Sequence, residues 1–464
     1  MKKIFFILAI LIFSGCSRIG APVTSYVHTA TTEATTATTI TTTTTTIPAT
    51  TTTEETTTTT TTAVPETTTT TTTVPTTTTV TTTTTTTTTT AATTVATTIA
   101  TNVAITVPAV IPTDYNTLNY REQKGVWISY LEYQTILKNR TKEQFRNSIN
   151  AYFDNIVSIG FNTVYVQLRA FGDAYYSSSY FPRGKEFSGK FSTGSIPFDP
   201  LEIMIKSAHD RGLSVHGWIN PMRLGTTSEI NNISDDIVYK KWIKNRTDDV
   251  FSADGRWYLN PSSDKAVSLI VSGAAEICTR YNIDGIQIDD YFYPDSSSNQ
   301  TKIKAVNALV KSLYSTVHTA NPDALFGISP QGTIENNLPL SADVEEWVTN
   351  PGYCDYILPQ VYFGFENWYS PFEETIGEWS ELVTAPGVKL VIGLAPYKIG
   401  LAESFTGSGK WEWANSTDII ARQMAASKKL SNYGGVALFR YDSLFNPTVG
   451  VAEAVSIEVN NIPK

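Results

Sequence analysis

The chain has 464 residues, a formal net charge of −9, nine Trp and three Cys. The acidic balance, with no Lys/Arg-rich face, argues against nucleic acid as a partner. Four His without paired ligand spacing predict no metal site, and Cys278 and Cys354 are expected to pack in a core rather than form a disulfide.

The N-terminus has the features of a bacterial lipoprotein signal. A basic start precedes the apolar run Ile4–Phe13, which is too short to span a bilayer. Ser14-Gly15-Cys16 resembles a lipobox, so we predict a signal peptide over 1–15 and a lipid on Cys16, within a lipidated N-terminus over 16–28. The alternative is an ordinary signal peptide with an incidental Cys. A lipid would anchor the chain to the outer face of the cell membrane, outside the cytoplasm.

Residues 29–118 are mostly Thr, with scattered Ala, Pro, Val and Glu. Such a segment has no apolar period and nothing large to bury, so we predict a disordered linker. The linker would carry the remaining domain, 119–464, from the membrane into the cell wall or periplasm.

That domain reads as eight rounds of strand followed by helix. Expected strands are 125–130, 162–169, 213–220, 285–292, 325–331, 356–363, 389–397 and 435–442. Between them, Thr141 and Gln144 form a capping box, and Asp199 with Pro200 is typical of a helix start. Eight alternations predict a (β/α)8 TIM barrel. No glycine-rich phosphate loop follows the first strand, which disfavours an open dinucleotide-binding sheet, and we predict no cofactor.

The stretch DGIQIDDYFYP (284–294) is the centre of the functional hypothesis. Its strand part alternates, so Ile286 and Ile288 face one side and Gln287 and Asp289 face the other. Two adjacent carboxylates where a buried strand opens into a loop are unfavourable without partners. The same alternation places polar side chains inward on five other strands, so they should meet at the C-terminal rim of the barrel, where barrel active sites lie.

Carboxylate, amide and aromatic groups at one rim are typical of sugar chemistry. A carboxylic acid protonates the leaving oxygen while a second carboxylate stabilises or attacks the oxocarbenium-like centre. Aromatic faces stack on pyranose rings, and amides orient the hydroxyls. No Ser-His-Asp arrangement or GxSxG elbow appears.

Six segments together resemble the glycosyl-hydrolase-like family 10 of bacterial lipoproteins. They are QLRAFGDAYYSS, VHGWINPMR, GIQIDDYFYP, FGISPQG, LPQVYF and GLAPYKIG, in the family's order across 121–445. The resemblance implies a barrel and, for some members, action on peptidoglycan glycan strands. It also implies that Asp289 and Asp290 are the family's acidic pair, and that Arg223 lies in the groove with Asn220, Gln360 and Tyr397.

The catalytic residues are predicted to be Asp289, Asp290 and Asp173. Asp289 is the expected nucleophile or charge stabiliser, and Asp290 is either its partner or a hydrogen-bonding support. Asp173 is the first candidate proton donor, with Glu335 and Glu366 as rivals, although Asp173 beside Gly172 equally suits a turn. Predicted substrate-binding residues are Arg169, Trp218, Asn220, Arg223, Tyr291, Gln331, Gln360, Tyr362 and Tyr397.

Three functions remain open from the sequence. The first is a lipid-anchored glycoside hydrolase of the cell envelope that acts on peptidoglycan glycan strands or a related polysaccharide. The second is a non-catalytic carbohydrate-binding lipoprotein that keeps the barrel. The third is a surface scaffold whose partner is another protein, which an exposed apolar patch away from the rim would favour.

Overall fold

The structure is a computed structural model that describes residues 114–189, 196–289, 292–294, 297–404 and 406–464, together with the backbone of four short strands within 42–87. Asn102–Lys464 forms one compact unit and Met1–Thr101 another. Cys16 and the predicted signal peptide lie outside the described residues, as do Asp290 and Tyr291.

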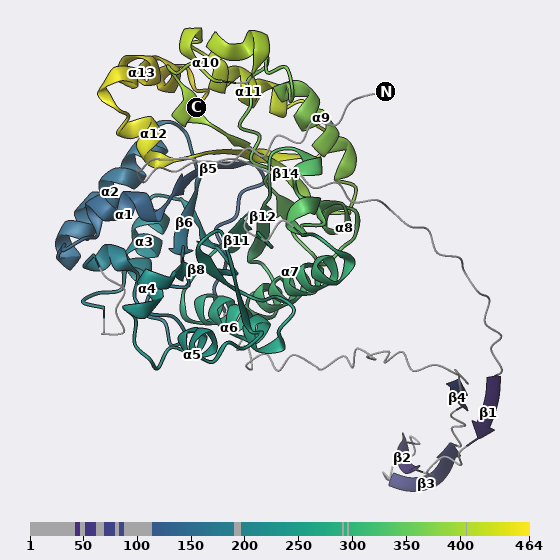
Figure 1. Cartoon of the computed structure of the whole chain (residues 1–464). Coiled ribbons are helices and arrows are strands. Elements are labelled where there is room, and N and C mark those ends of the chain that lie inside the picture. The colour runs from purple at the N-terminus through teal and green to yellow at the C-terminus, as the bar shows by residue number, and fades with distance from the viewer. Residues whose placement is uncertain are drawn as a thin grey trace, which may run out of the picture. The chain divides into compact units, whose positions relative to one another are not determined.

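The larger unit contains a closed barrel of eight parallel strands surrounded by helices (Figure 1). Around the barrel the order is β11-β12-β13-β14-β15-β5-β6-β7, so consecutive strands in the chain are neighbours in space. The predicted (β/α)8 barrel is confirmed. The strands are β5 (Gln123–Ile128), β6 (Thr163–Arg169), β7 (Ser214–Ile219), β11 (Gly285–Asp289), β12 (Leu325–Ser329), β13 (Tyr356–Ile357), β14 (Lys389–Leu394) and β15 (Tyr433–Leu438).

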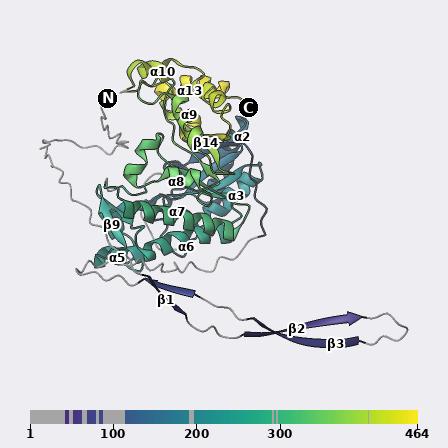
Figure 2. The ribbon, with the colours of Figure 1, turned by 90° about the vertical axis from the view of Figure 1, so that its right-hand side faces the viewer.

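Helices cover the outside of the barrel, and α6 and α7 pack side by side against it (Figures 1 and 2). The main helices are α1 (Tyr130–Ile136), α2 (Lys142–Ser158), α3 (Pro200–His209), α6 (Asp264–Arg280), α7 (Gln300–Ala320), α8 (Val344–Thr349), α9 (Phe372–Leu382), α11 (Ile419–Ser427) and α13 (Ala452–Asn461). Both predicted helix starts are present. Thr141 and Gln144 cap α2 reciprocally, and Asp199 accepts hydrogen bonds from the first turn of α3.

Alternation along the strands sorts the core into two layers. Apolar residues predicted to face the helices lie in the large cluster between barrel and helices, among them Val164, Val215, Phe326 and Ile392. A smaller cluster fills the barrel axis, where His216 is buried with its ring nitrogens near the Tyr356 hydroxyl and the Asn119 side chain. The axial cluster comprises Trp127, Tyr165, Trp218, Tyr356, Leu358, Val391 and Ala437.

A three-stranded antiparallel sheet is inserted after β7, in the order β8 (Arg223–Thr226), β10 (Arg256–Leu259), β9 (Val250–Ala253). The helices α4 (Thr227–Asn231) and α5 (Val238–Asn245) belong to the same insertion. Asp254 and Gly255 join β9 to β10, both with positive φ, as a two-residue hairpin turn requires. The sequence reading did not predict this sheet.

The segment preceding β5 closes the N-terminal end of the barrel. Asp284, directly before β11, accepts hydrogen bonds at Oδ1 from the Tyr115 hydroxyl (2.8 Å) and the Leu118 amide (2.6 Å). At Oδ2 it accepts one from the Val215 amide (2.7 Å) and lies 2.8 Å from His209 Nε2. Contacts with the barrel therefore begin within the segment that the sequence assigns to the linker.

The smaller unit pairs Thr-rich strands in twos. β1 (Thr42–Thr46) pairs with β4 (Thr83–Thr87), and β2 (Thr52–Thr61) with β3 (Thr69–Thr78). Two-stranded ribbons without an apolar face are at most marginally stable in water, so these pairs supply no second core.

Two findings concern the described residues as a whole. None of their helices is long and apolar enough to cross a membrane. Cys278 and Cys354 are both buried and free, as predicted.

Candidate active site

Asp289 ends β11 at the C-terminal rim and is joined to a chain of amide hydrogen bonds. The backbone amide of Tyr130 donates to Gln167 Oε1 (3.0 Å), and Gln167 Nε2 donates to Asn220 Oδ1 (2.7 Å). Asn220 Nδ2 then donates to Asp289 Oδ1. Each step fixes the next, because an amide whose oxygen accepts must present its NH2 on the other side.

This amide chain has a chemical consequence for Asp289. Asp289 is only 6% exposed, so a fixed donor replaces part of the water that would otherwise solvate its charge. A hydrogen bond donated to a carboxylate favours the ionised form. The arrangement suits a nucleophile or charge stabiliser rather than a proton donor. Gln167 was not predicted as a site residue, although the alternation along β6 placed it inward.

Aromatic rings around Phe439 form a second feature of the rim, which we call the aromatic wall. Phe439, which follows β15, lies with its ring centroid 6.5 Å from that of Trp218, 5.9 Å from that of Tyr362 and 6.2 Å from that of Tyr397. The Trp127 ring lies 5.8 Å from Phe439. The predicted residues Trp218, Tyr362 and Tyr397 are therefore brought together, around an aromatic residue that the sequence reading missed.

The rim also holds the predicted glutamines. Gln331 and Gln360 pair through an isolated parallel bridge, and both are half-buried. Gln360 Nε2 approaches the Ser329 carbonyl at 3.5 Å. Two amide side chains thus lie next to one another beyond β12 and β13, where they can contact hydroxyl groups of a ligand.

Arg169 does not face the opening, so the prediction that it lines the groove is wrong. The pairing of β6 with β7 shifts register between Gln167 and Arg169, and this extra residue turns the arginine outward. Its guanidinium lies 3.8 Å from the centroid of the Phe181 ring and donates to the Pro221 carbonyl (2.9 Å). Full burial lowers the pKa of Arg169.

Asp173 is also fully buried, in the loop after β6. Its Oδ1 accepts hydrogen bonds from the backbone amides of Ala170 and Phe171, each at 2.9 Å, and Gly172, directly before Asp173, has φ +70°. This is the turn-forming role that the sequence left open. Burial raises the pKa of Asp173, but its carboxyl group is enclosed and does not reach the rim.

Arg223 begins β8 and lies half-buried beside the same loop, with its guanidinium 4.4 Å from the centroid of the Phe171 ring. Lys185 Nζ lies 4.8 Å from that centroid, and the Arg256 guanidinium lies 5.4 Å from it. Phe171 also contacts Tyr130 edge-on, at 4.9 Å. The three cationic side chains thus surround Phe171, and Phe171 packs on Tyr130. The Tyr130 backbone amide donates the first hydrogen bond of the chain that ends at Asp289.

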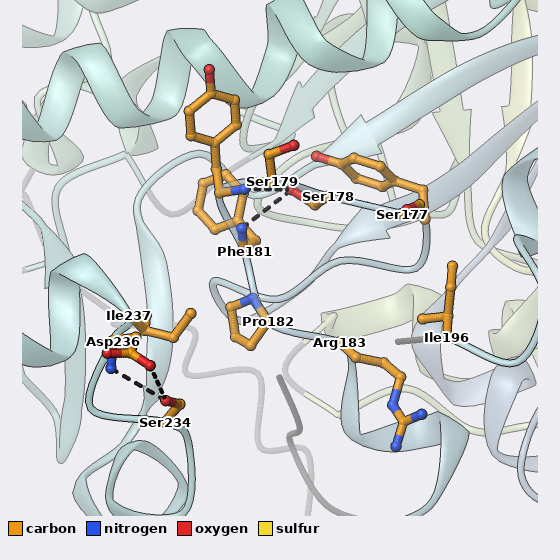
Figure 3. Close-up of a pocket in the computed structure, with 12 residues that line it drawn as sticks. Ser177, Ser178, Ser179, Phe181, Pro182, Arg183, Ile196, Ser234, Asp236 and Ile237 are labelled. Carbon is orange, nitrogen blue, oxygen red and sulfur yellow. Dashed lines mark hydrogen bonds between the residues drawn. The ribbon is translucent and has the colours of Figure 1, made fainter. Parts of the chain in front are cut away.

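A cavity of about 360 Å³ opens elsewhere, beside the loop after β6 (Figure 3). Its lining is residues 176–183 with Ile196, Ser234, Asp236 and Ile237. None of the lining residues is among the predicted catalytic and substrate-binding residues. The cavity lies between the loop after β6 and the insertion after β7.

Comparisons with known proteins agree with the resemblance seen in the sequence. The family model described as glycosyl hydrolase-like 10 matches residues 122–305 and 299–411. Glycosyl hydrolase DigH of Escherichia coli O6:H1 is 30% identical over 335 residues, which cover 63% of this chain and 75% of DigH. Glycosyl hydrolase YngK of Bacillus subtilis (strain 168) is 28% identical over 395 residues, which cover 76% of this chain and 74% of YngK.

Among solved structures, alpha-L-fucosidase isoenzyme 2 from Paenibacillus thiaminolyticus matches with a TM-score of 0.46 at 13% identity, covering 74% of this chain and 48% of that one. The family match rests instead on the sequence, and it spans the barrel strands β5 to β14. The chain belongs to the glycosyl hydrolase-like 10 family.

Proposed function

We propose that the chain is a glycoside hydrolase of the cell envelope that cleaves peptidoglycan glycan strands or a related polysaccharide. The observation that carries the proposal is Asp289 at the barrel rim, held by the Asn220 amide, together with the aromatic wall of the same rim. A fixed donor favours the carboxylate form, and an oxocarbenium-like transition state needs a negative charge near the anomeric carbon.

A glycosidase also needs a carboxylic acid to protonate the leaving oxygen. Because Asp173 is enclosed, the candidates to test beside it are Asp290, Glu335 and Glu366, of which the two glutamates are exposed. Replacing the true acid by its amide should abolish cleavage of natural strands while sparing an aryl glycoside whose leaving group needs no proton. A variant that loses both activities would not carry the acid.

The test of the main proposal is the release of reducing ends from purified, peptide-free glycan strands. Asp289→Asn should lower the rate about a thousandfold or more, because the charge is lost while the shape is kept. The melting temperature should stay close to that of the unmodified protein. Equal rates for the two proteins would refute the assignment.

A second candidate function is a carbohydrate-binding lipoprotein without turnover. The burial of Asp173 favours it, since the first candidate acid does not reach the rim. That function predicts retention on glycan strands with no products, and retention unchanged in Asp289→Asn.

We also propose that a lipid on Cys16 anchors the chain to the cell membrane, with the barrel extended into the wall or periplasm. After removal of the signal peptide, the lipid on Cys16 would hold the chain in the membrane fraction. Cys16→Ser should move the protein to the soluble fraction and abolish labelling by a palmitate analogue. A variant that stays labelled would contradict the anchor.

A further inference from the structure

Three aromatic side chains on the loops after β13 and β14 stand in solvent. Trp368 is 74% exposed, Tyr369 66% and Trp411 55%. Other aromatics of the rim loops are buried, including Tyr176 and Trp413. We call the three exposed residues the aromatic shelf. Exposed Trp is unusual because burying such a ring is strongly favourable, so the shelf needs an explanation outside the core.

The backbone beneath the shelf is held in place. The Trp368 amide donates to the Thr406 carbonyl (3.1 Å), and the Asn367 side chain accepts from the Tyr369 amide (3.0 Å). The Glu412 carboxylate accepts from two further amides of the same loop, at 2.9 Å each. These bonds tie the loop after β13 to the loop after β14, so the rings are presented from a fixed frame.

Gly407 completes that frame. It begins the 3-10 helix η5 (Gly407–Trp411) and has φ +63°. A Cβ at this position would lie 2.9 Å from Trp368 Cε3, so only glycine lets the indole lie over the backbone here. Trp411 ends the same short helix, at a rise of about 2 Å per residue from Gly407. Trp368 thus packs against the first residue of η5, and Trp411 is its last residue.

The loops that carry the shelf also carry two aromatic residues of the candidate active site. Tyr362 lies on the rim and precedes Trp368 by six positions, so their Cα atoms are at most about 21 Å apart. Lys398, next to the rim residue Tyr397, donates to the Tyr362 carbonyl at 2.6 Å. Tyr362 and Tyr397 thus lie on the loops that carry the shelf, after β13 and β14, and a hydrogen bond joins the two loops.

The surroundings of the rings indicate a hydroxylated ligand. Glu366 and Lys410 are exposed beside them, and Lys410 Nζ lies 5.2 Å from the centroid of the Trp411 ring. Trp368 and Tyr369 stack with their ring centroids 5.8 Å apart, so the shelf is a small aromatic surface flanked by charged side chains rather than a large apolar patch. Such a surface matches a pyranose, which has an apolar face to stack and hydroxyl groups at its edge.

We propose that the aromatic shelf is a binding site for sugar rings of a polysaccharide strand, beyond the point of cleavage. This inference rests on the proposed function, because it assumes that the strand bound at the rim is a polysaccharide. A long strand would then contact the rim and the shelf at once, and a second contact on one chain raises affinity through its effective concentration.

The test measures binding without turnover. Peptide-free glycan strands are titrated against the Asp289→Asn protein, with and without the double substitution Trp368→Ala and Tyr369→Ala. The shelf predicts roughly tenfold weaker binding by the double variant, the usual scale for truncating aromatic anchors. The single substitution Trp368→Phe keeps an aromatic ring, so it should bind the strands nearly as tightly as the parent, whereas Trp368→Ala should not.

Leu338→Ala is the matched control, since Leu338 is 51% exposed on the loop after β12. It should leave the affinity unchanged, and all variants should melt alike because the replaced side chains are exposed. Equal binding by the shelf variants and their parent would overturn the proposal, whatever the cleavage assay shows. Loss of a self-associated form in sedimentation would overturn it too, by assigning the rings to a second copy. Failure of the cleavage assay alone would refute only the hydrolase assignment.

Discussion

Two carboxylates at opposite ends of β11 have contrasting environments. Asp284, before the strand, is fully buried and surrounded by the Tyr115 hydroxyl, two backbone amides and His209. Asp289, at the end of the strand, accepts a hydrogen bond from the Asn220 side chain, which in turn accepts one from Gln167. One strand thus carries both acids, one before its start and one at its end.

The difference shows how burial and hydrogen bonding assign a role to an acid. Backbone amides and the segment before β5 donate hydrogen bonds to Asp284, as expected for a residue that stabilises the N-terminal end of a barrel. Side-chain amides orient Asp289, which fits a reactive part at the loop end. The sequence DGIQIDD contains both acids within six positions, and the sequence pattern alone does not tell the two environments apart.

The largest expected effect is on stability, at the closed end. Asp284→Asn places an NH2 group against hydrogen-bond donors, so it should lower the free energy of unfolding by about 3 to 5 kcal/mol. Chemical unfolding measures this loss. If Asp284→Asn unfolded at the same denaturant concentration as the parent, Asp284 would not have the structural role that distinguishes it from Asp289.

A second expected effect is a pH dependence of stability caused by Glu186, a buried acid with too few hydrogen-bond donors. Burial and the nearby Asp173 raise the pKa of Glu186 to about 7, although the Tyr175 hydroxyl donates to it. Between pH 4.5 and pH 7 the folded state therefore holds a proton that the unfolded state has lost, so stability falls as the pH rises through this range. The fall is at most about 3 kcal/mol, because one pKa unit corresponds to 1.36 kcal/mol.

Glu186→Gln should flatten this decline, as measured by unfolding at pH 5 and pH 8. Glu202→Gln, at an exposed position of α3, is the matched control and should leave the decline unchanged. A decline of the same size in Glu186→Gln would show that other groups cause it.

A third effect concerns the amide chain at the rim. Gln167→Leu frees the Asn220 side chain and should lower kcat/KM by roughly 10- to 100-fold, as small misplacements of reacting groups do. Gln167→Glu should be equally harmful, because its carboxylate offers no NH2 to Asn220. Both variants should also shift the acidic limb of the pH–rate profile upward, since Asp289 loses a fixed donor. If activity fell while the acidic limb of the pH–rate profile stayed in place, Gln167 would contribute only to packing.

The smallest effect tests the aromatic wall. Phe439→Leu should lower kcat/KM by about 3- to 10-fold, because ring–ring contacts are worth about 0.5 to 1.5 kcal/mol beyond burial. Phe445→Leu, on α12 (Tyr441–Phe445), is the control and should leave catalysis unchanged. If Phe439→Leu had the same kcat/KM as Phe445→Leu, the aromatic wall would not contribute to catalysis.

The barrel was predictable because its signal is distributed along the chain. Each strand needs only alternation or a short apolar run, and eight repeats of strand and helix leave few other architectures. The strand predicted over 356–363 is shorter, and β13 ends at Ile357 because Pro359 has no amide for the ladder. The hairpin at Asp254-Gly255 had a clear sequence signal that was missed.

The site was partly predictable for the same reason. Trp218, Asn220 and Asp289 follow the alternation of regular strands, and Asn220 is hydrogen-bonded to Asp289. Phe439 shares the inward face of β15 with Ala437, so the same rule would have found it. Arg169 could not be placed, because its orientation depends on a register shift between β6 and β7 that the local sequence does not signal.

The most direct measurement compares the two ends of β11 in one assay. The rate of reducing-end release per folded molecule is determined for Asp284→Asn and Asp289→Asn, with the folded fraction taken from unfolding curves. We predict that Asp284→Asn stays within about threefold of the parent, while Asp289→Asn loses about a thousandfold or more. Comparable losses in both variants, or full activity in Asp289→Asn, would contradict the placement of the chemistry at the C-terminal rim.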